Sequence, residues 1–166
     1  MGWAMVNGRI LPLHDARIPA DDPGFTLGWT VFETMLVLDG AVPRLTEHLA
    51  RLAASAEATC IPLPDIASEV VTLARKASVP SRLRVTLSGS GLRVLPLEPV
   101  SKDRWGKGVR CARGPSVTSP LLSGAVKHGS RAAWVSGVKR AGVDDLLLVD
   151  DDGRFTEAAS AGIVAI

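Results

Sequence analysis

The sequence predicts a fold of the α/β (α+β) class, in which helices and strands alternate, and three observations lead to it. Two short apolar runs flank Asn7-Gly8 within residues 3–12, and this dipeptide is typical of a tight hairpin turn. Residues 31–38 form an apolar run of strand-favouring side chains. Leucine and alanine recur at helical spacing over residues 46–58. A helix therefore follows the first strands.

The remaining elements are predicted from the same patterns. Thr46 is placed to cap the first helix, and Asp65 to cap a second helix that ends near Pro80. Gly142 is expected to end a third helix over residues 129–141. Alternating or continuously apolar segments predict further strands at residues 82–87, 92–97, 109–112, 146–149, 154–156 and 163–166.

A polar stretch with flanking proline and glycine, residues 101–108, predicts a linker between two domains. Residues 1–100 then form a small N-terminal α/β domain, and residues 109–166 form the first part of a second domain. This second part has a single predicted helix and a few short strands. Because it also ends on an apolar run, we expect it to be an incomplete domain.

Composition narrows the possible functions. The chain has 166 residues, of which 46% are hydrophobic and 22% charged, a balance typical of globular proteins. Its net charge of +2 is too small to predict binding to nucleic acid. No apolar run approaches the roughly 20 residues of a membrane span, and no signal peptide is evident, so we expect a cytoplasmic protein. Cys60 and Cys111 are expected to be buried, reduced thiols, with no metal bound.

Lys127, Glu157 and Arg51 supply an amine, a carboxylate and a guanidinium. A pyridoxal 5′-phosphate site requires these three groups. The amine forms a Schiff base, the carboxylate keeps the ring nitrogen protonated, and the cation meets the phosphate. Each residue alone could equally be an ordinary solvated side chain.

Four segments resemble motifs of one known family, in the family's order: residues 22–34, 45–52, 126–131 and 144–157. The second is similar to the pattern L-x-x-H-L-x-R-L, and the fourth to D-E-A-L-L-L-D-x-x-G-x-V-T-E. The family is that of the pyridoxal phosphate enzymes of fold type IV, also called class IV aminotransferases. The resemblance implies that residues 109–166 begin its larger, cofactor-binding domain. It also implies that the end of that domain is lacking.

The resemblance further implies roles for the three candidate residues. Lys127 is the Schiff-base lysine and the catalytic residue, Glu157 is the partner of the pyridine nitrogen, and Arg51 binds the phosphate. Family members act on small-molecule amines, and they are typically dimers, so a homodimer is expected.

Lys127-His128 followed shortly by Arg131 is similar to 4-amino-4-deoxychorismate lyases, which release pyruvate to give 4-aminobenzoate. The resemblance thus favours a lyase of this kind. The alternatives are a branched-chain or D-amino acid aminotransferase, a truncated and non-catalytic homologue, and a small binding module without cofactor.

Several residues near the motifs depart from the family or have no assigned role. Trp29 stands where the family usually has Asp, and Gly162 stands where an Asn is common. Glu33 and Thr34 alternate along one predicted strand, so one of them faces the functional side, but spacing does not decide which. His48 is expected to pack within its helix.

Overall fold

The computed structural model describes residues 2–100, 106–116 and 121–164. These residues form two compact units. The first unit takes in everything described up to residue 100, together with residues 125–130, and the second contains the rest. Most of the predicted linker lies outside the described residues, and the predicted domain assignment stays a prediction.

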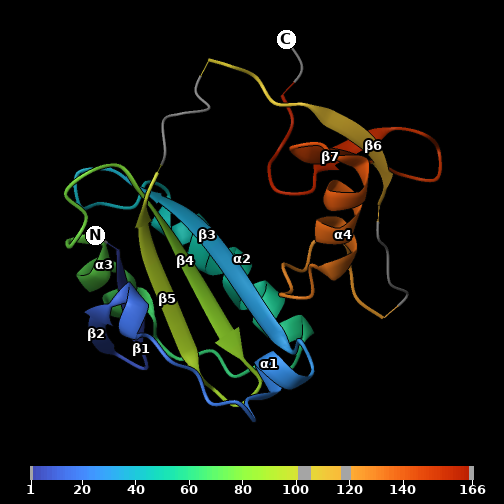
Figure 1. Ribbon diagram of the computed structural model, residues 1–166. Helices are drawn as coiled ribbons and strands as arrows, with labels where there is room; N and C mark the ends of the chain where they lie inside the picture. Colours follow the sequence, from blue (N-terminus) through green and yellow to red (C-terminus); the bar gives the residue numbers. More distant parts are fainter. Residues whose placement is uncertain (1, 101–105, 117–120, 165–166) are drawn as a thin grey trace. The chain divides into compact units, whose positions relative to one another are not determined.

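A five-stranded antiparallel sheet forms the centre of the first unit (Figure 1). Its strands, in the order β2-β1-β5-β4-β3, are β1 (Trp3–Val6), β2 (Arg9–Pro12), β3 (Thr30–Val37), β4 (Ser81–Ser88) and β5 (Arg93–Pro99). The predicted first hairpin is confirmed. Asn7 and Gly8 have φ angles of 47° and 83°, and two positive φ values are what its turn type requires.

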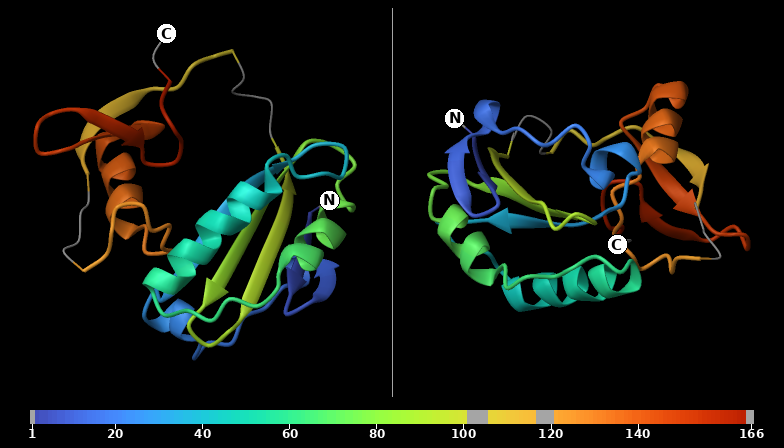
Figure 2. Two further views of the ribbon diagram at one scale, coloured as in Figure 1. Left: turned by 180° about the vertical axis from the view of Figure 1, so that it is seen from behind. Right: turned by 90° about the horizontal axis from the view of Figure 1, so that it is seen from below.

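The helical elements of the first unit are η1 (Leu13–Asp15), α1 (Pro23–Thr26), α2 (Leu45–Ala58) and α3 (Ala67–Ala74). Figure 2 shows α2 and α3 on the same face of the sheet. Leu52 of α2 and Leu73 of α3 are fully buried there with Met35 and Val85 of the sheet. Removal of this apolar surface from water is the main force that holds the helices on the strands.

The two predicted helix caps differ in outcome. The prediction for Thr46 was wrong, because α2 already begins at Leu45 after Arg44, which has a left-handed φ of 56° and makes no side-chain cap bond. The N-cap of α3 is Ile66, not Asp65, and it makes no side-chain cap bond, but the side chain of Asp65 accepts a hydrogen bond from the backbone N–H of Ala67 at 3.2 Å. However, α3 ends at Ala74, well before Pro80.

The second unit has a three-stranded sheet of order β6-β7-β8, with α4 packed against β6 and β7. Its elements are β6 (Cys111–Pro115), α4 (Ala132–Ala141), β7 (Asp145–Val149) and β8 (Phe155–Ala158). β6 runs parallel to β7, and β8 is antiparallel to it. Gly142 ends α4 at a φ of 64°, as predicted. Ile163 and Val164 are not in a strand, and the rest of that predicted strand lies outside the described residues.

Both cysteines are free and exposed, so the prediction that they are buried was wrong. Cys60 follows the end of α2 in a left-handed turn with a φ of 55°, and Cys111 begins the edge strand β6. Within the described residues, no helix has the length and apolar character to cross a membrane. The same residues contain no group of three or more His, Cys, Asp or Glu side chains that could hold a metal ion.

Candidate active site

The segment that carries Lys127 extends the sheet of the first unit along the free edge of β3. The backbone N–H of Phe32 donates to the carbonyl oxygen of Lys127 at 2.8 Å. Two residues further on, the N–H of Gly129 donates to the carbonyl oxygen of Thr30 at 2.9 Å. β3 is an edge strand of the sheet, so these bonds use groups that no other strand of the sheet occupies. The lysine main chain is therefore fixed to β3.

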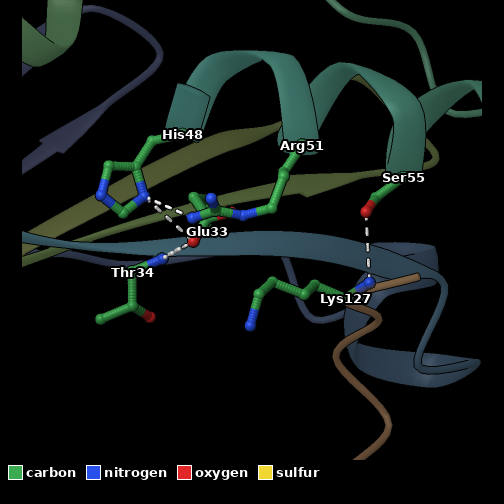
Figure 3. A network of polar contacts seen from close by, with 6 residues as sticks. All are labelled: Glu33, Thr34, His48, Arg51, Ser55 and Lys127. Carbon is green, nitrogen blue, oxygen red and sulfur yellow. Dashed lines mark hydrogen bonds and ion pairs between the residues drawn. The ribbon is translucent and has the colours of Figure 1, made fainter. Parts of the chain in front are cut away.

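A second anchor comes from α2. The backbone N–H of Lys127 donates to the side-chain oxygen of Ser55 at 3.2 Å, and Ser55 is only 2% exposed (Figure 3). Val126 packs against the buried core beside it. The two main-chain polar groups of Lys127 thus bind two different elements, a strand and a helix.

The side chain of Lys127 is exposed and lies on the same side of β3 as Thr34, away from α2 (Figure 3). Its Nζ atom is 5.8 Å from the centre of the Phe32 ring. The guanidinium of Arg84 lies 3.7 Å from the centre of the same ring. This face of β3 therefore presents two cations over an aromatic ring, and cations are attracted to the face of such a ring.

On the other side of β3, the carboxylate of Glu33 faces α2. It is 2% exposed and accepts a hydrogen bond from Nε of Arg51 at 3.1 Å. Nδ1 of His48 lies 2.8 Å from Nη2 of Arg51 and 3.3 Å from Oε1 of Glu33. Glu33 also accepts a bond from the backbone N–H of Thr34 at 3.1 Å. The buried carboxylate thereby holds a guanidinium whose side chain is 49% exposed.

This network answers the question that the sequence left open, because Thr34 shares its side of the strand with the Lys127 side chain while Glu33 faces the helix. His48 was expected only to pack within its helix, yet it contacts both Glu33 and Arg51. The sequence did contain an indication of this contact. His48 and Arg51 are three residues apart, which places both on one face of a helix.

Glu157 belongs to the second unit. It lies in β8 opposite Leu148, and its side chain is exposed. The hairpin between β7 and β8 is fixed by Asp150, whose side chain accepts the backbone N–H of Arg154 at 2.8 Å. Of the three predicted site residues, Arg51 and Lys127 thus belong to one unit and Glu157 to the other.

Asp22 ties the loop before β3 to the turn between β4 and β5. Its carboxylate is 5% exposed and accepts hydrogen bonds from Gly24 N–H at 2.7 Å, from Ser88 Oγ at 3.0 Å and from Ser90 Oγ at 2.5 Å. Burial raises the pKa of Asp22, but the bonds from Ser90, Gly24 and Ser88 together outweigh it and hold the pKa below its ordinary value. The loop before β3 is thereby anchored to the end of β4 and to the turn that follows it.

Trp29, the departure from the family motif, has a packing role. Its Nε1 donates to the carbonyl oxygen of Thr59 at 2.9 Å, just beyond the end of α2. Its ring lies so close to Gly89 that a Cβ atom there would come within 2.2 Å of it. Trp29 therefore connects the end of α2 to the turn between β4 and β5.

Two of the predicted site residues, Lys127 and Arg51, present their amine and guanidinium on opposite sides of β3. Lys127 offers an exposed amine on a fixed main chain. Arg51 has a guanidinium with five N–H donors, and its bonds to Glu33 and His48 leave donors for a phosphate.

Comparison with known proteins shows which family this chain is similar to. A family model described as "Amino-transferase class IV" matches residues 30–166. A putative branched-chain-amino-acid aminotransferase of Methanocaldococcus jannaschii is 29% identical over 196 aligned positions, which cover 97% of this chain and 64% of that protein.

Solved structures are similar as well. A hypothetical aminotransferase from Mycobacterium tuberculosis matches with a TM-score of 0.81 and 25% identity over 96% of this chain and 65% of its own, and it is also known in a PLP-bound form. A putative branched-chain amino acid aminotransferase from Thermotoga maritima shares the fold, with a TM-score of 0.80 and 18% identity over 95% of this chain and 60% of its own. The chain thus spans slightly less than two thirds of the length of these relatives.

Proposed function

Because the chain belongs to the class IV aminotransferase family, we propose that it binds pyridoxal 5′-phosphate and transfers the amino group of an amino acid, most simply a branched-chain one. The observation that carries this proposal is the placement of Lys127. Its main chain is bound by β3 and by α2, and its side chain lies on the side of β3 away from α2. α2 also supplies Arg51, whose guanidinium is held by a buried carboxylate.

The relatives support the aminotransferase alternative better than the lyase that Lys127-His128 and Arg131 predicted. The relative from Methanocaldococcus jannaschii is described as a putative branched-chain-amino-acid aminotransferase. Leucine, isoleucine and valine are therefore the amino donors to test first.

When bound, pyridoxal phosphate supplies an electron sink for the charge that develops at the α-carbon of an amino acid. Lys127 would hold the cofactor covalently through its amine and, once displaced by the substrate, would move a proton at the substrate α-carbon. Arg51 would bind the phosphate oxygens. Glu157 would hold a proton on the pyridine nitrogen.

The test begins with the 166-residue chain and pyridoxal 5′-phosphate. We expect a visible absorbance band, and after reduction with borohydride a single labelled peptide that contains Lys127. Lys127→Ala should abolish the label, whereas Lys139→Ala, which removes an exposed amine in the last turn of α4, should retain it. A label on Lys139 in the unchanged chain would overturn the assignment.

Substrate class is decided with the same preparation. Transfer of the amino group from leucine, isoleucine or valine to a 2-oxo acid supports the proposal. Release of pyruvate from 4-amino-4-deoxychorismate, without transfer from any amino acid, would instead establish the lyase.

A further inference from the structure

We propose that Ser55, which lies on α2, is a positioning residue for Lys127. This inference rests on the proposed function for its chemistry. Its geometry comes from the first unit alone.

Ser55 and Arg51 lie four residues apart on α2, so one face of the helix carries both of them, one turn after the other. Arg51 uses that face to reach the carboxylate of Glu33 on β3. Ser55 uses it to accept the backbone N–H of Lys127. Figure 3 shows Arg51 and Ser55 one after the other along α2, with the Arg51 side chain directed at Glu33 and the Ser55 side chain at the backbone of Lys127.

The hydroxyl of Ser55 accepts a hydrogen bond from Lys127, which an apolar side chain could not do. Ser55 is 2% exposed, so the donor that reaches it is shielded from bulk water on that side. A buried N–H without an acceptor is costly, and the hydroxyl oxygen provides that acceptor. The carbonyl of Lys127 is already bound by the N–H of Phe32. With both groups bound, only the side chain of Lys127 is left to be ordered when a ligand binds.

Two features keep this part of α2 in place. Its carbonyl oxygen accepts the hydroxyl of Thr59 at 2.8 Å, which tightens the last turn of α2. The neighbouring Ala56 is 1% exposed in the apolar core. The Ser55 hydroxyl is thus presented from a rigid, well-packed part of the helix, which is the support that a precise functional site requires.

The first experiment measures the contact without any cofactor. In the full 166-residue chain, hydrogen exchange at the Lys127 amide should become about tenfold or more faster in Ser55→Ala, since the acceptor is lost. Ser55→Thr keeps a hydroxyl and should restore protection. Ser68→Ala removes an exposed serine from α3 and should leave that amide unchanged. Equal exchange in Ser55→Ala and the unchanged chain would overturn the inference.

The second experiment separates positioning from mere stability. Ser55→Ala should bind pyridoxal 5′-phosphate about tenfold more weakly, while its binding of inorganic phosphate stays unchanged, because only the Lys127 side of the site is loosened. Equal loss of both ligands would mean that Ser55 serves the fold alone, and it would overturn the inference. If the unchanged chain takes no cofactor, the proposed function fails, and the exchange experiment still decides whether Ser55 holds Lys127.

Discussion

Glu33 and Arg51 form an unequal ion pair, in which a carboxylate that is 2% exposed holds a guanidinium whose side chain is 49% exposed. The cost of losing each partner differs for this reason. Without Glu33, the cation of Arg51 can turn to water. Without Arg51, the carboxylate stays inside the protein, with His48 and one backbone N–H beside it. A stranded buried charge is the expensive case.

Arg51→Ala should therefore lower the free energy of unfolding, and Glu33→Gln introduced in the same chain should recover part of the loss. We expect a coupling of about 1 kcal/mol in a double-mutant cycle by urea unfolding, kept small because Arg51 is half exposed. Arg75→Ala, which removes an exposed arginine just after α3, serves as the control. Strict additivity of the two substitutions would show that the pair contributes nothing to stability.

Gly129 is the position where a single methyl group should detach the lysine segment from β3. A Cβ atom there would lie 1.9 Å from Oγ1 of Thr30. Gly129→Ala should cost about 2 kcal/mol of stability and reduce borohydride labelling of Lys127. Thr30→Ala removes the atom that clashes and should restore part of both.

The control for this substitution is Gly124→Ala, since nothing lies within 4 Å of the Cβ position there. Thermal unfolding and peptide mapping of the unchanged chain and of the variants with Gly129→Ala, Thr30→Ala and Gly124→Ala provide the measurements. If Gly129→Ala unfolds at the temperature of the unchanged chain and labels equally well, the segment is not held by this pairing.

The sequence predicted most elements of the first unit because their signals are local. Asn7-Gly8 and the apolar alternation of β4 each specify their own conformation. The Thr46 cap was wrong because the backbone at Arg44 enters the helix from a left-handed conformation that no local pattern showed. The exposure of both cysteines depends on helix and sheet edges, which composition does not reveal.

The candidate site was predictable only in part. Motifs indicated Lys127 and Arg51, but the contacts of Ser55 and Glu33 join segments far apart in the chain, at separations of 72 and 18 residues. Such contacts become visible only when β3, α2 and the lysine segment are assembled. The roles of Lys127, Arg51 and Glu157 and the homodimer stay predictions, because they require a ligand or a second chain to test.

Asp22 predicts a dependence of stability on pH. Its pKa in the folded protein lies below the ordinary value of about 3.9, so the folded state binds the proton less readily than the unfolded state. The stabilisation is complete above that ordinary value and is lost as the pH falls through the lower pKa of the folded state.

The advantage of the unchanged chain over Asp22→Asn in urea unfolding should accordingly be constant near pH 7 and shrink below about pH 4. Asp21→Asn, the exposed neighbour, is the matched control and should change stability little at any pH. An advantage that grows on acidification would contradict the depressed pKa.

Glu157 offers the sharpest test of the second unit's part in the chemistry. Glu157→Gln keeps the shape of the side chain on β8 but removes the charge that would hold a proton on the pyridine nitrogen. We expect the affinity for pyridoxal 5′-phosphate to change little and turnover with a branched-chain amino acid to fall by orders of magnitude, because ring protonation matters most in the transition state.

Asp152→Asn removes an exposed carboxylate from the same hairpin and should leave both quantities unchanged. Cofactor titration by absorbance and steady-state kinetics measure the two effects separately. Unchanged turnover in Glu157→Gln would show that this carboxylate is only solvated, and the ring nitrogen would then need another partner.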